Sequence, residues 1–286
     1  MTEPTQPPGT PSEPVAVDIN VDAALVLKSM VGIDEYPQVL ALMPNIYRPE
    51  DQHRVHAAIV TELAAAGIVH EGSVHTHVAH WLRCLERPDM ELAARVVHTG
   101  LDGQPASMLR LSLVRRAEEH ILAIRCDDRV VLQPVFHEGR KLTTLTSAVL
   151  AALGPYPPLA IDTLAATMEQ FAAVPAEPEQ RRRALLALGA TAHTAATLTR
   201  ALDEVIRRAE IVTIEHRDGT DQIPQFSLSV LDTPRGRIVA APARALDGGK
   251  RSTYTRGDAA AIGSGIAALI ELLPSGSWFD TSRTTE

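Results

Sequence analysis

The chain has few cysteines and no long apolar run. Its 286 residues include only Cys84 and Cys126, and two distant cysteines in apolar contexts indicate buried free thiols rather than a disulfide framework. This usage fits a reducing cytoplasm. The longest apolar stretch, residues 259–273, is shorter than the roughly 20 residues that span a bilayer, and residues 1–14 lack the basic and apolar parts of a signal peptide. We therefore expect a cytoplasmic protein without membrane insertion.

The chain also lacks an excess of basic residues. Its formal net charge is −8, whereas a nucleic-acid-binding protein needs a basic surface to neutralise phosphates. The densest basic run, residues 181–183, is typical of a solvated helix face. No nucleic-acid partner is expected. The hydrophobic content of 45% is sufficient for a large core, so the chain is globular.

Residues 209–254 are the segment from which the fold is most readily interpreted. Short runs of alternating apolar and polar residues lie between turn-forming groups at 218–219, 233–236 and 247–249, which predicts an antiparallel β-meander. Phe226, Leu228 and Val230 point to one face of it. A final helix follows, because the next apolar residues share one helical face: Ile262, Ile266, Leu269, Ile270 and Leu273.

The first half of the chain shows the same order of elements. A strand near residues 15–21 precedes helices at about 22–32, 49–67 and 75–85, and Asp22 is placed to cap the first of these helices. Residues 37–43 fit a strand or a helix equally. Four strands follow Pro88, and a helix that ends at Gly154 closes this half.

The second half is predicted to contain helices at about 162–174, 177–189 and 191–208, then the meander and the final helix. The shared order indicates an architectural pseudo-repeat. We expect a disordered tail at residues 1–14 and a single domain at 15–280, made of the halves 15–154 and 159–280. Pairing the two meanders into one sheet would remove an exposed edge from each, with the helices packed in two groups beside it.

Candidate metal ligands and cofactor-binding glycines do not form a familiar set. His70, His75, His77 and His80 are close in sequence, but no cysteine or carboxylate completes a recognisable ligand set, so no bound zinc or other metal is predicted. The glycines at 263 and 265 lie inside the final helix, where they favour close helix packing over dinucleotide binding.

Catalytic arrangements are also missing from the sequence. Residues 248–252 superficially resemble a phosphate loop and are interpreted as a hairpin turn, because the required upstream glycine is absent. His120, Glu215, His216 and Asp232 form a hydrolase only in a geometry that the sequence does not supply, and no nucleophile elbow is present. We predict no catalytic residue, no cofactor and no enzymatic activity.

Five segments occur in a characteristic order. They are VDAALVLKSMVGIDEYPQVLALMP, ERPDMELAARV, RAEEHILAIRCDDRVVLQ, FSLSVLDTPRGRIVAAPARALDG and TRGDAAAIGSGIAALIELLPSGSWF. Together they resemble the EspG family, the cytosolic chaperones of mycobacterial type VII (ESX) secretion, over about residues 17–279. The resemblance implies an α+β fold: a central antiparallel β-sheet flanked by N-terminal and C-terminal helical bundles, with quasi-two-fold symmetry.

The same resemblance implies binding without catalysis. A member of this family binds the tip of the PPE subunit in a PE–PPE heterodimer, keeps that apolar tip soluble, and directs the pair to its cognate ESX secretion system. The family uses no cofactor. An enzyme of unknown class that uses residues 70–80 or the meander loops is the alternative interpretation.

The family's contact regions correspond to four parts of this chain: the loop at 98–106, residues 217–226 of the second meander, the helices around 185–205, and the central sheet. For the apolar residues of these helices, ordinary core packing is the alternative. Ile223 is of interest because it is aliphatic in an otherwise polar turn, where side chains are normally solvated. The partner-binding residues implied by the resemblance are Leu101, Gln104, Arg217, Gln222, Ile223 and Phe226.

Overall fold

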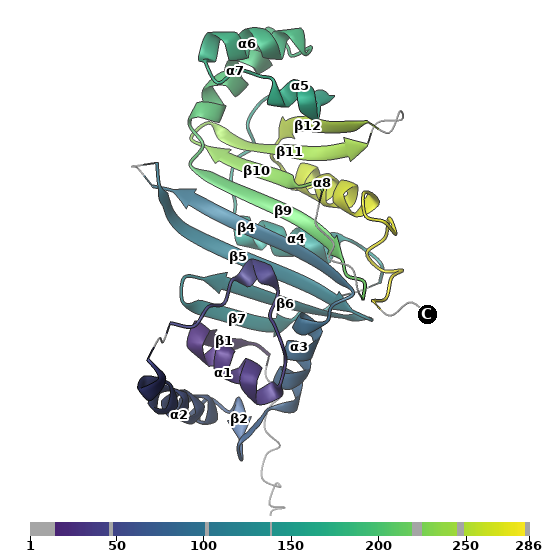
Figure 1. Ribbon diagram of the computed structural model, residues 1–286. Helices are drawn as coiled ribbons and strands as arrows, with labels where there is room; N and C mark the ends of the chain where they lie inside the picture. Colours follow the sequence, from purple (N-terminus) through teal and green to yellow (C-terminus); the bar gives the residue numbers. More distant parts are fainter. Residues whose placement is uncertain are drawn as a thin grey trace, which may run out of the picture.

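The protein is described by a computed structural model that covers residues 15–45, 48–100, 103–137, 139–218, 225–244 and 249–283. The predicted tail at 1–14 lies outside these ranges. One ten-stranded antiparallel sheet extends along the molecule (Figure 1). From edge to edge its strands are β1 (Val17–Asn20), β7 (Arg129–Pro134), β6 (Glu119–Cys126), β5 (Pro105–Arg116), β4 (Met90–Thr99), β9 (Arg207–Glu215), β10 (Leu228–Thr233), β11 (Gly236–Arg244), β12 (Lys250–Arg256) and β8 (Leu164–Thr167).

The order of the strands is symmetric about its centre. β4 pairs with β9 from Met90 opposite Glu215 to His98 opposite Arg207. On either side the meander continues outward, and the first strand of each half, β1 or β8, forms the outer edge. A pseudo-two-fold axis therefore passes between β4 and β9 near the pair Ala94 and Ile211. The expected quasi-two-fold α+β fold, with both meanders joined in one sheet, is confirmed.

Helices form two bundles at the ends of the sheet and one layer over its centre (Figure 1). The N-terminal bundle contains α1 (Val21–Val31), α2 (Pro49–Ala65) and α3 (Thr76–Glu86), with the short elements η1 (Gln38–Leu40), β2 (Val69–His70) and β3 (Ser73–Val74). The C-terminal bundle contains α5 (Met168–Ala172), α6 (Pro178–Ala187) and α7 (Ala192–Asp203). The closing helices α4 (Thr143–Leu153) and α8 (Ala259–Glu271) pack against each other. In the described ranges, every helix falls short of the length and apolarity needed to cross a bilayer.

Three hydrophobic clusters result from this arrangement. α4 and α8 cover one face of the central strands and bury Leu92, Leu111 and Ile211 with their neighbours. On the opposite face the N-terminal bundle packs over Val114, and the C-terminal bundle packs over Leu231. Because successive side chains of a strand alternate between faces, β4 and β9 also present a second set of side chains between the two bundles.

Several local predictions are wrong where tertiary contacts compete with local pattern. Residues 162–174 show a helical pattern, but β8 first pairs with β12 and only the short α5 is helical. The helix predicted over 191–208 ends at Asp203, because the chain enters β9 at Arg207. Asn20 rather than Asp22 caps α1, since its Oδ1 accepts the Ala23 N–H at 2.7 Å.

Two side chains differ from their predicted exposure. Cys84 is buried, but Cys126 is exposed. Arg181, predicted on a solvated face, is buried at the contact between α6 and α7. Its guanidinium donates to the Thr199 carbonyl at 3.0 Å and to the Asp203 carboxylate at 2.6 Å. The first arginine of the basic run therefore holds the C-terminal bundle together.

Gly265 allows α8 to lie close to the sheet, as its position in the helix predicts. A Cβ added at Gly265 would lie 2.5 Å from Cδ1 of Leu228, a fully buried residue of β10. A Cβ added at Gly263 would meet only Thr146 of α4, at 3.5 Å, which is an ordinary contact.

We expect Gly265→Ala to lower the free energy of unfolding by about 1–3 kcal/mol, because an extra methyl group in a filled core forces its neighbours to shift. Gly263→Ala is the matched control. It adds the same methyl group without a clash, and its better helix propensity should raise stability by up to about 1 kcal/mol. Urea denaturation of both variants measures the difference. Equal stabilities would show that Leu228 does not limit the approach of α8.

We also expect residues 1–154, expressed alone, not to form a soluble, cooperatively melting fragment. The fragment would leave β4 as an unpaired edge and would remove α8 from the cluster that α4 shares with it. Calorimetry and gel filtration of the fragment, with the full chain as reference, test this expectation. A monomeric fragment with a single sharp thermal transition would contradict it.

Candidate functional site

The centre of the sheet carries a surface between the two bundles. On the face opposite α4 and α8, β4 presents Arg95 and Val97, and β9 presents Arg208 and Glu210; all four are at least partly exposed. A hollow of about 410 Å³ lies over them. We call this surface the central trough and define it by its lining residues: Arg95, Val97, Thr99, Met108, Val205, Arg208 and Glu210.

The hairpin between β4 and β5 and the junction between α7 and β9 meet at one end of the central trough. The Thr99 N–H donates to the Ile206 carbonyl at 2.9 Å, and the Ile206 N–H donates to the Asp232 carbonyl at 2.9 Å. These bonds hold the junction in line with the sheet. The Ile206 side chain nevertheless remains 43% exposed, which is uncommon among large apolar residues in the described ranges. The hairpin, the sheet and the C-terminal bundle therefore converge at this corner.

The lining of the central trough contains two arginines and one glutamate, a small positive excess, although the chain as a whole is acidic. Arg95 Nη2 lies 3.5 Å from Oε2 of Glu210, its partner across the strands. Arg110 of β5 lies nearby on the same face. Burial lowers the pKa of Arg110, and the positive charges of Arg125 and Arg95 lower it further, which shows that the cations crowd one another. Aliphatic and guanidinium groups thus lie together on this surface.

Only some of the expected contact residues lie at this corner. Gln104 lies in the hairpin, where its carbonyl accepts the Gly100 N–H at 2.7 Å. Leu101 belongs to the same connection in sequence but lies outside the described residues. Gln222 and Ile223 also lie outside them.

The structure places Arg217 and Phe226 at the other end of the sheet. β9 runs antiparallel to β4, so its C-terminal end lies beside Met90, about 27 Å along the strand from the hairpin. Arg217 lines a second hollow of about 360 Å³ there, on the same face as the central trough. Phe226 packs with the cluster beneath α8, with Lys250 Nζ 5.1 Å from its ring centroid. The pseudo-two-fold axis causes this separation, because it exchanges the two ends of the sheet.

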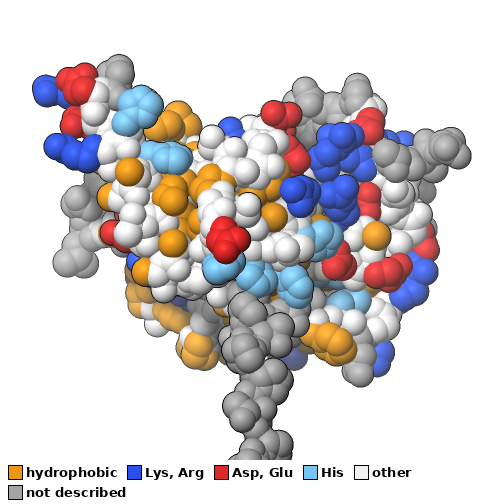
Figure 2. Space-filling view, turned by 90° about the horizontal axis from the view of Figure 1, so that it is seen from below, with side chains coloured by type: hydrophobic (Ala, Val, Ile, Leu, Met, Phe, Trp, Pro, Cys, Tyr) orange, Lys and Arg blue, Asp and Glu red, His pale blue; other side chains and the backbone are white. Residues whose placement is uncertain are grey.

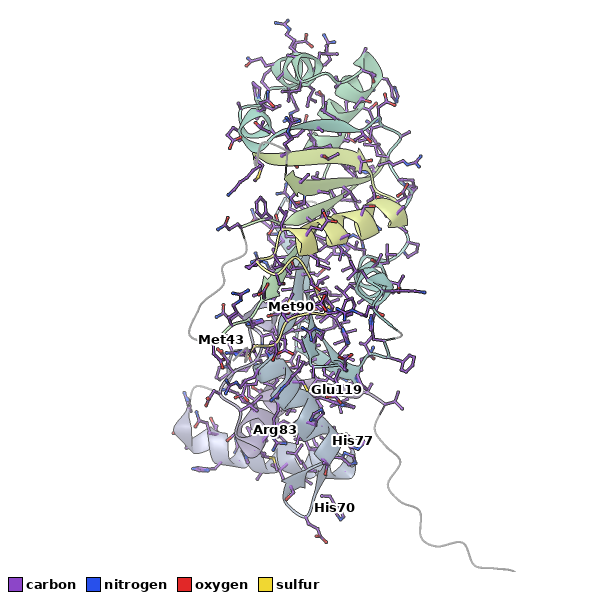
Figure 3. All side chains as sticks on the ribbon, turned by 90° about the vertical axis from the view of Figure 1, so that its right-hand side faces the viewer. Met43, His70, His77, Arg83, Met90 and Glu119 are labelled. Carbon is purple, nitrogen blue, oxygen red and sulfur yellow. The ribbon has the colours of Figure 1, made fainter. Side chains whose placement is uncertain are left out.

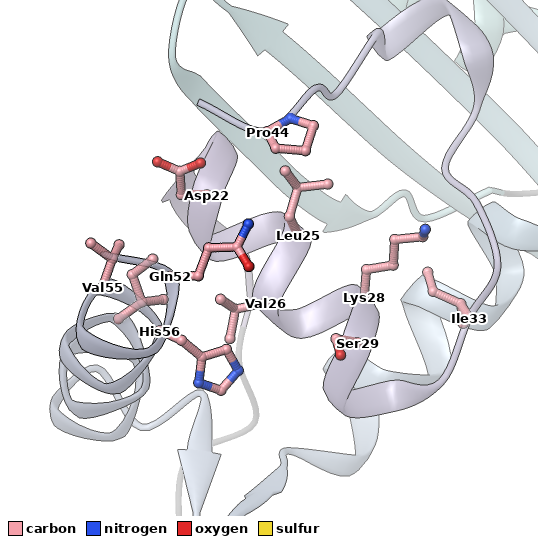
Figure 4. A pocket seen from close by; sticks show the side chains of 11 residues that line it. Asp22, Leu25, Val26, Lys28, Ser29, Ile33, Pro44, Gln52, Val55 and His56 are labelled. Atoms are coloured by element: carbon pink, nitrogen blue, oxygen red, sulfur yellow. The ribbon is translucent and has the colours of Figure 1, made fainter. Parts of the chain in front are cut away.

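Another hollow, of about 530 Å³, lies between α1 and α2. Figure 4 shows Asp22, Lys28 and His56 spread around it rather than directed at one point. Leu25, Val26 and other aliphatic groups form part of its lining. The hollow therefore offers a mixed surface without a convergent set of polar groups among these residues.

The residues considered for catalysis serve structural contacts instead. Asp232 is 1% exposed, and its carboxylate accepts from Nε of Arg207 and from Nε of Arg237, each at 2.6 Å. At the far end of β9, Glu215 accepts the Ser275 N–H at 2.9 Å. His216 Nε2 lies 3.2 Å from Glu91. Asp232 lies near the start of β9, whereas Glu215 and His216 lie at its end. The three residues therefore do not form one site.

His120 belongs to a buried aromatic contact with the C-terminal segment. Its Nε2 accepts the indole N–H of Trp278 at 3.0 Å, and its ring stacks on His137 with centroids 4.6 Å apart. Burial lowers the pKa of His120 to about 4, and the neighbouring charges of His137 and Arg115 contribute in the same direction. The neutral ring is therefore the form that the fold requires.

Histidines gather at the end of the molecule formed by the N-terminal bundle (Figure 2). His75 accepts the His77 N–H at 3.3 Å at the start of α3, and His70 lies in the hairpin of β2 and β3. His80 instead lies with Cys84 and Glu119, with one potential ligand atom of each within 4.8 Å of the others. A cysteine and a carboxylate therefore lie beside one of these histidines, although the three donors are one short of a tetrahedral ligand set. The spacing of four residues on a predicted helix could have indicated that His80 and Cys84 lie on the same face.

The chain matches known proteins over nearly its whole length. The model of the EspG family matches residues 20–268. The ESX-3 secretion-associated protein EspG3 of Mycolicibacterium smegmatis is 32% identical over 280 residues, covering 95% of this chain and 92% of that protein. The ESX-1 secretion-associated protein EspG1 of Mycobacterium marinum is 29% identical, covering 97% and 95%.

A solved structure has the same fold. It is the Mycobacterium tuberculosis type VII secretion system chaperone EspG5 in complex with the PE25–PPE41 dimer. The likeness has a TM-score of 0.77 at 21% sequence identity and covers 93% of this chain and 100% of that one.

The contact between His120 and Trp278 predicts that the free energy of unfolding decreases when the pH is lowered. The folded-state pKa of about 4 lies below the value of about 6.5 for an unfolded chain, so the stabilisation is complete above pH 6.5 and is lost as the pH falls toward 4. We expect a loss of roughly 3 kcal/mol over this range from His120. His120→Leu should be less stable than the parent at pH 7.5, with the difference narrowing at pH 4.5. If denaturation experiments give the same difference in stability between His120→Leu and the parent at both pH values, His120 does not have the lowered pKa.

Proposed function

The chain belongs to the EspG family, and on this basis we propose that it is a cytosolic chaperone for PE–PPE heterodimers in type VII secretion. It binds the tip of the PPE subunit, keeps that tip soluble and directs the pair to its cognate ESX system. The observation that carries this proposal is the match to secretion-associated EspG proteins along almost the entire chain. The function is binding without catalysis and without a cofactor.

We place the PPE contact at the corner where the hairpin of β4 and β5 meets the central trough. Two features support this location: the exposed Ile206 side chain and the hollow over the strands. Leu101 and Gln104 of the hairpin are proposed to take part. A solvent-facing aliphatic group beside a concave surface is typical of a protein contact.

The chemistry of the central trough indicates what the partner surface contains. Val97, Met108 and Val205 offer apolar contact. Arg208 supplies positive charge, whereas Arg95 is paired with Glu210. A PPE tip that combines aliphatic side chains with carboxylates would complement both properties, because interfaces pair opposite potentials around an apolar centre. Arg217 and Phe226 are proposed contacts if the partner extends along β4 and β9 to the opposite end. Gln222 and Ile223 are proposed contacts on the basis of the family resemblance alone.

Co-expression with a panel of PE–PPE pairs tests the function itself. We expect one pair to form a soluble ternary complex with this chain on gel filtration. Aggregation of every pair, with the chain remaining alone, would refute the proposed chaperone function.

A point variant then tests the location. Ile206→Asp places a charge in a contact that loses water on binding, and we expect it to weaken the complex by about 2 kcal/mol, roughly 30-fold in Kd. Phe136→Asp is the matched control, because Phe136 is 86% exposed and follows β7 at the opposite end of the strands. It should leave the affinity unchanged. Both substitutions are on the surface, so thermal melts should change little. A folded Ile206→Asp variant with parental affinity would remove this corner from the interface.

A further inference from the structure

One side-chain cluster is not used by the proposed chaperone function. α3 presents His80 and Cys84 one turn apart, and Glu119 begins β6 directly after the turn from β5. His80 Nε2 lies 2.5 Å from Glu119 Oε2. Cys84 Sγ lies 3.6 Å from that nitrogen and 3.9 Å from that oxygen. Figure 3 shows Glu119, His77 and Arg83 in this part of the molecule, where β6 lies beside α3.

These separations are close to those of ligands around one metal ion. Donor atoms bound to a tetrahedral zinc at about 2.0–2.3 Å lie roughly 3.3–3.7 Å from each other. Both distances from Cys84 Sγ are near this range. Only the contact between His80 and Glu119 has to open, by roughly 0.8 Å, and both side chains are free to do so, with exposures of 48% and 57%.

An ordinary ion pair accounts for only part of this cluster. His80 and Glu119 alone would form a surface pair, which contributes little to stability. Cys84 adds a sulfur atom from the buried side, in a residue that is 0% exposed, so the three donor atoms lie together at the boundary of core and solvent.

We propose that His80, Cys84 and Glu119 form a zinc site with water in the fourth position. One imidazole, one thiolate and one carboxylate are each established zinc ligands, and the mixed set suits this borderline-soft ion better than magnesium or calcium, which prefer oxygen. The thiolate and the carboxylate together neutralise the charge of Zn²⁺. On binding, the zinc–sulfur bond replaces the S–H bond and the proton leaves to solvent. The ion would fix α3 of the N-terminal bundle to the turn between β5 and β6.

Cobalt(II) is a suitable probe because it replaces zinc and its thiolate complex absorbs light. The full chain, purified without a histidine tag and stripped with a chelator, is titrated with cobalt chloride. We expect a near-ultraviolet sulfur-to-cobalt band that saturates at one ion per chain and disappears when zinc chloride is added. Zinc should also raise the melting temperature, since a ligand that binds the folded state stabilises it.

Matched variants identify the ligands. Cys84→Ser should abolish the sulfur-to-cobalt band, whereas Cys126→Ser, at the exposed second cysteine, should retain it. His80→Ala and Glu119→Gln should each weaken zinc binding by at least about a hundredfold, while His70→Ala should not. Because Cys84 is buried, its variant could fail to fold; the two half-exposed ligands then decide the question. Parental affinity in both His80→Ala and Glu119→Gln, or no saturating band in the parent, would overturn the proposal.

Discussion

β4 and β9 exchange backbone hydrogen bonds along their whole length, and each is the inner edge of its own meander. Left alone, either edge would expose a row of unpaired N–H and C=O groups. Their pairing also brings α4 and α8 together over a cluster to which both halves contribute, including Leu92 and Leu111 from the first and Ile211 from the second. The central sheet and its largest apolar cluster therefore depend on the same contact between two strands.

The central trough is a consequence of this contact. Each bundle packs over the outer strands of its own half, and η1 also packs on β4 and β5. The side chains that β4 and β9 turn away from α4 and α8 are therefore exposed mainly toward the hairpin, as at Arg95, Thr99 and Arg208. The part of the junction near the hairpin is thus the part where this face of the sheet remains open. In the proposed function, the partner uses a surface that exists only in the joined molecule, which links chaperone activity to the integrity of the whole fold.

Buried charges maintain the alignment around this junction. Asp232 accepts from Arg207 at the start of β9 and from Arg237 of β11. The centroid of the Tyr156 ring lies 5.7 Å from the guanidinium carbon of Arg207 and 5.5 Å from that of Arg237. Loss of one partner from such a network leaves an uncompensated charge in the core, which costs more than the pair contributes. Residues that suggest a catalytic acid or base in the sequence therefore act here as structural ties. The proposed zinc site, beside the turn between β5 and β6, lies at the end of the strands remote from the hairpin, so metal binding and partner binding can be tested separately.

The sequence by itself determined the two meanders, the closing helices and the pseudo-repeat, because periods of two and of about 3.6 residues are local properties of the chain. The order of five segments was sufficient for the family and the fold. Only the tertiary structure decided that residues 217–226 begin at the end of the sheet opposite the hairpin, since this depends on the antiparallel register of β4 and β9. It also buried Arg181 between two helices and brought Glu119 to His80 and Cys84. Such contacts join residues far apart in sequence, and local sequence patterns do not predict which distant side chains will be in contact.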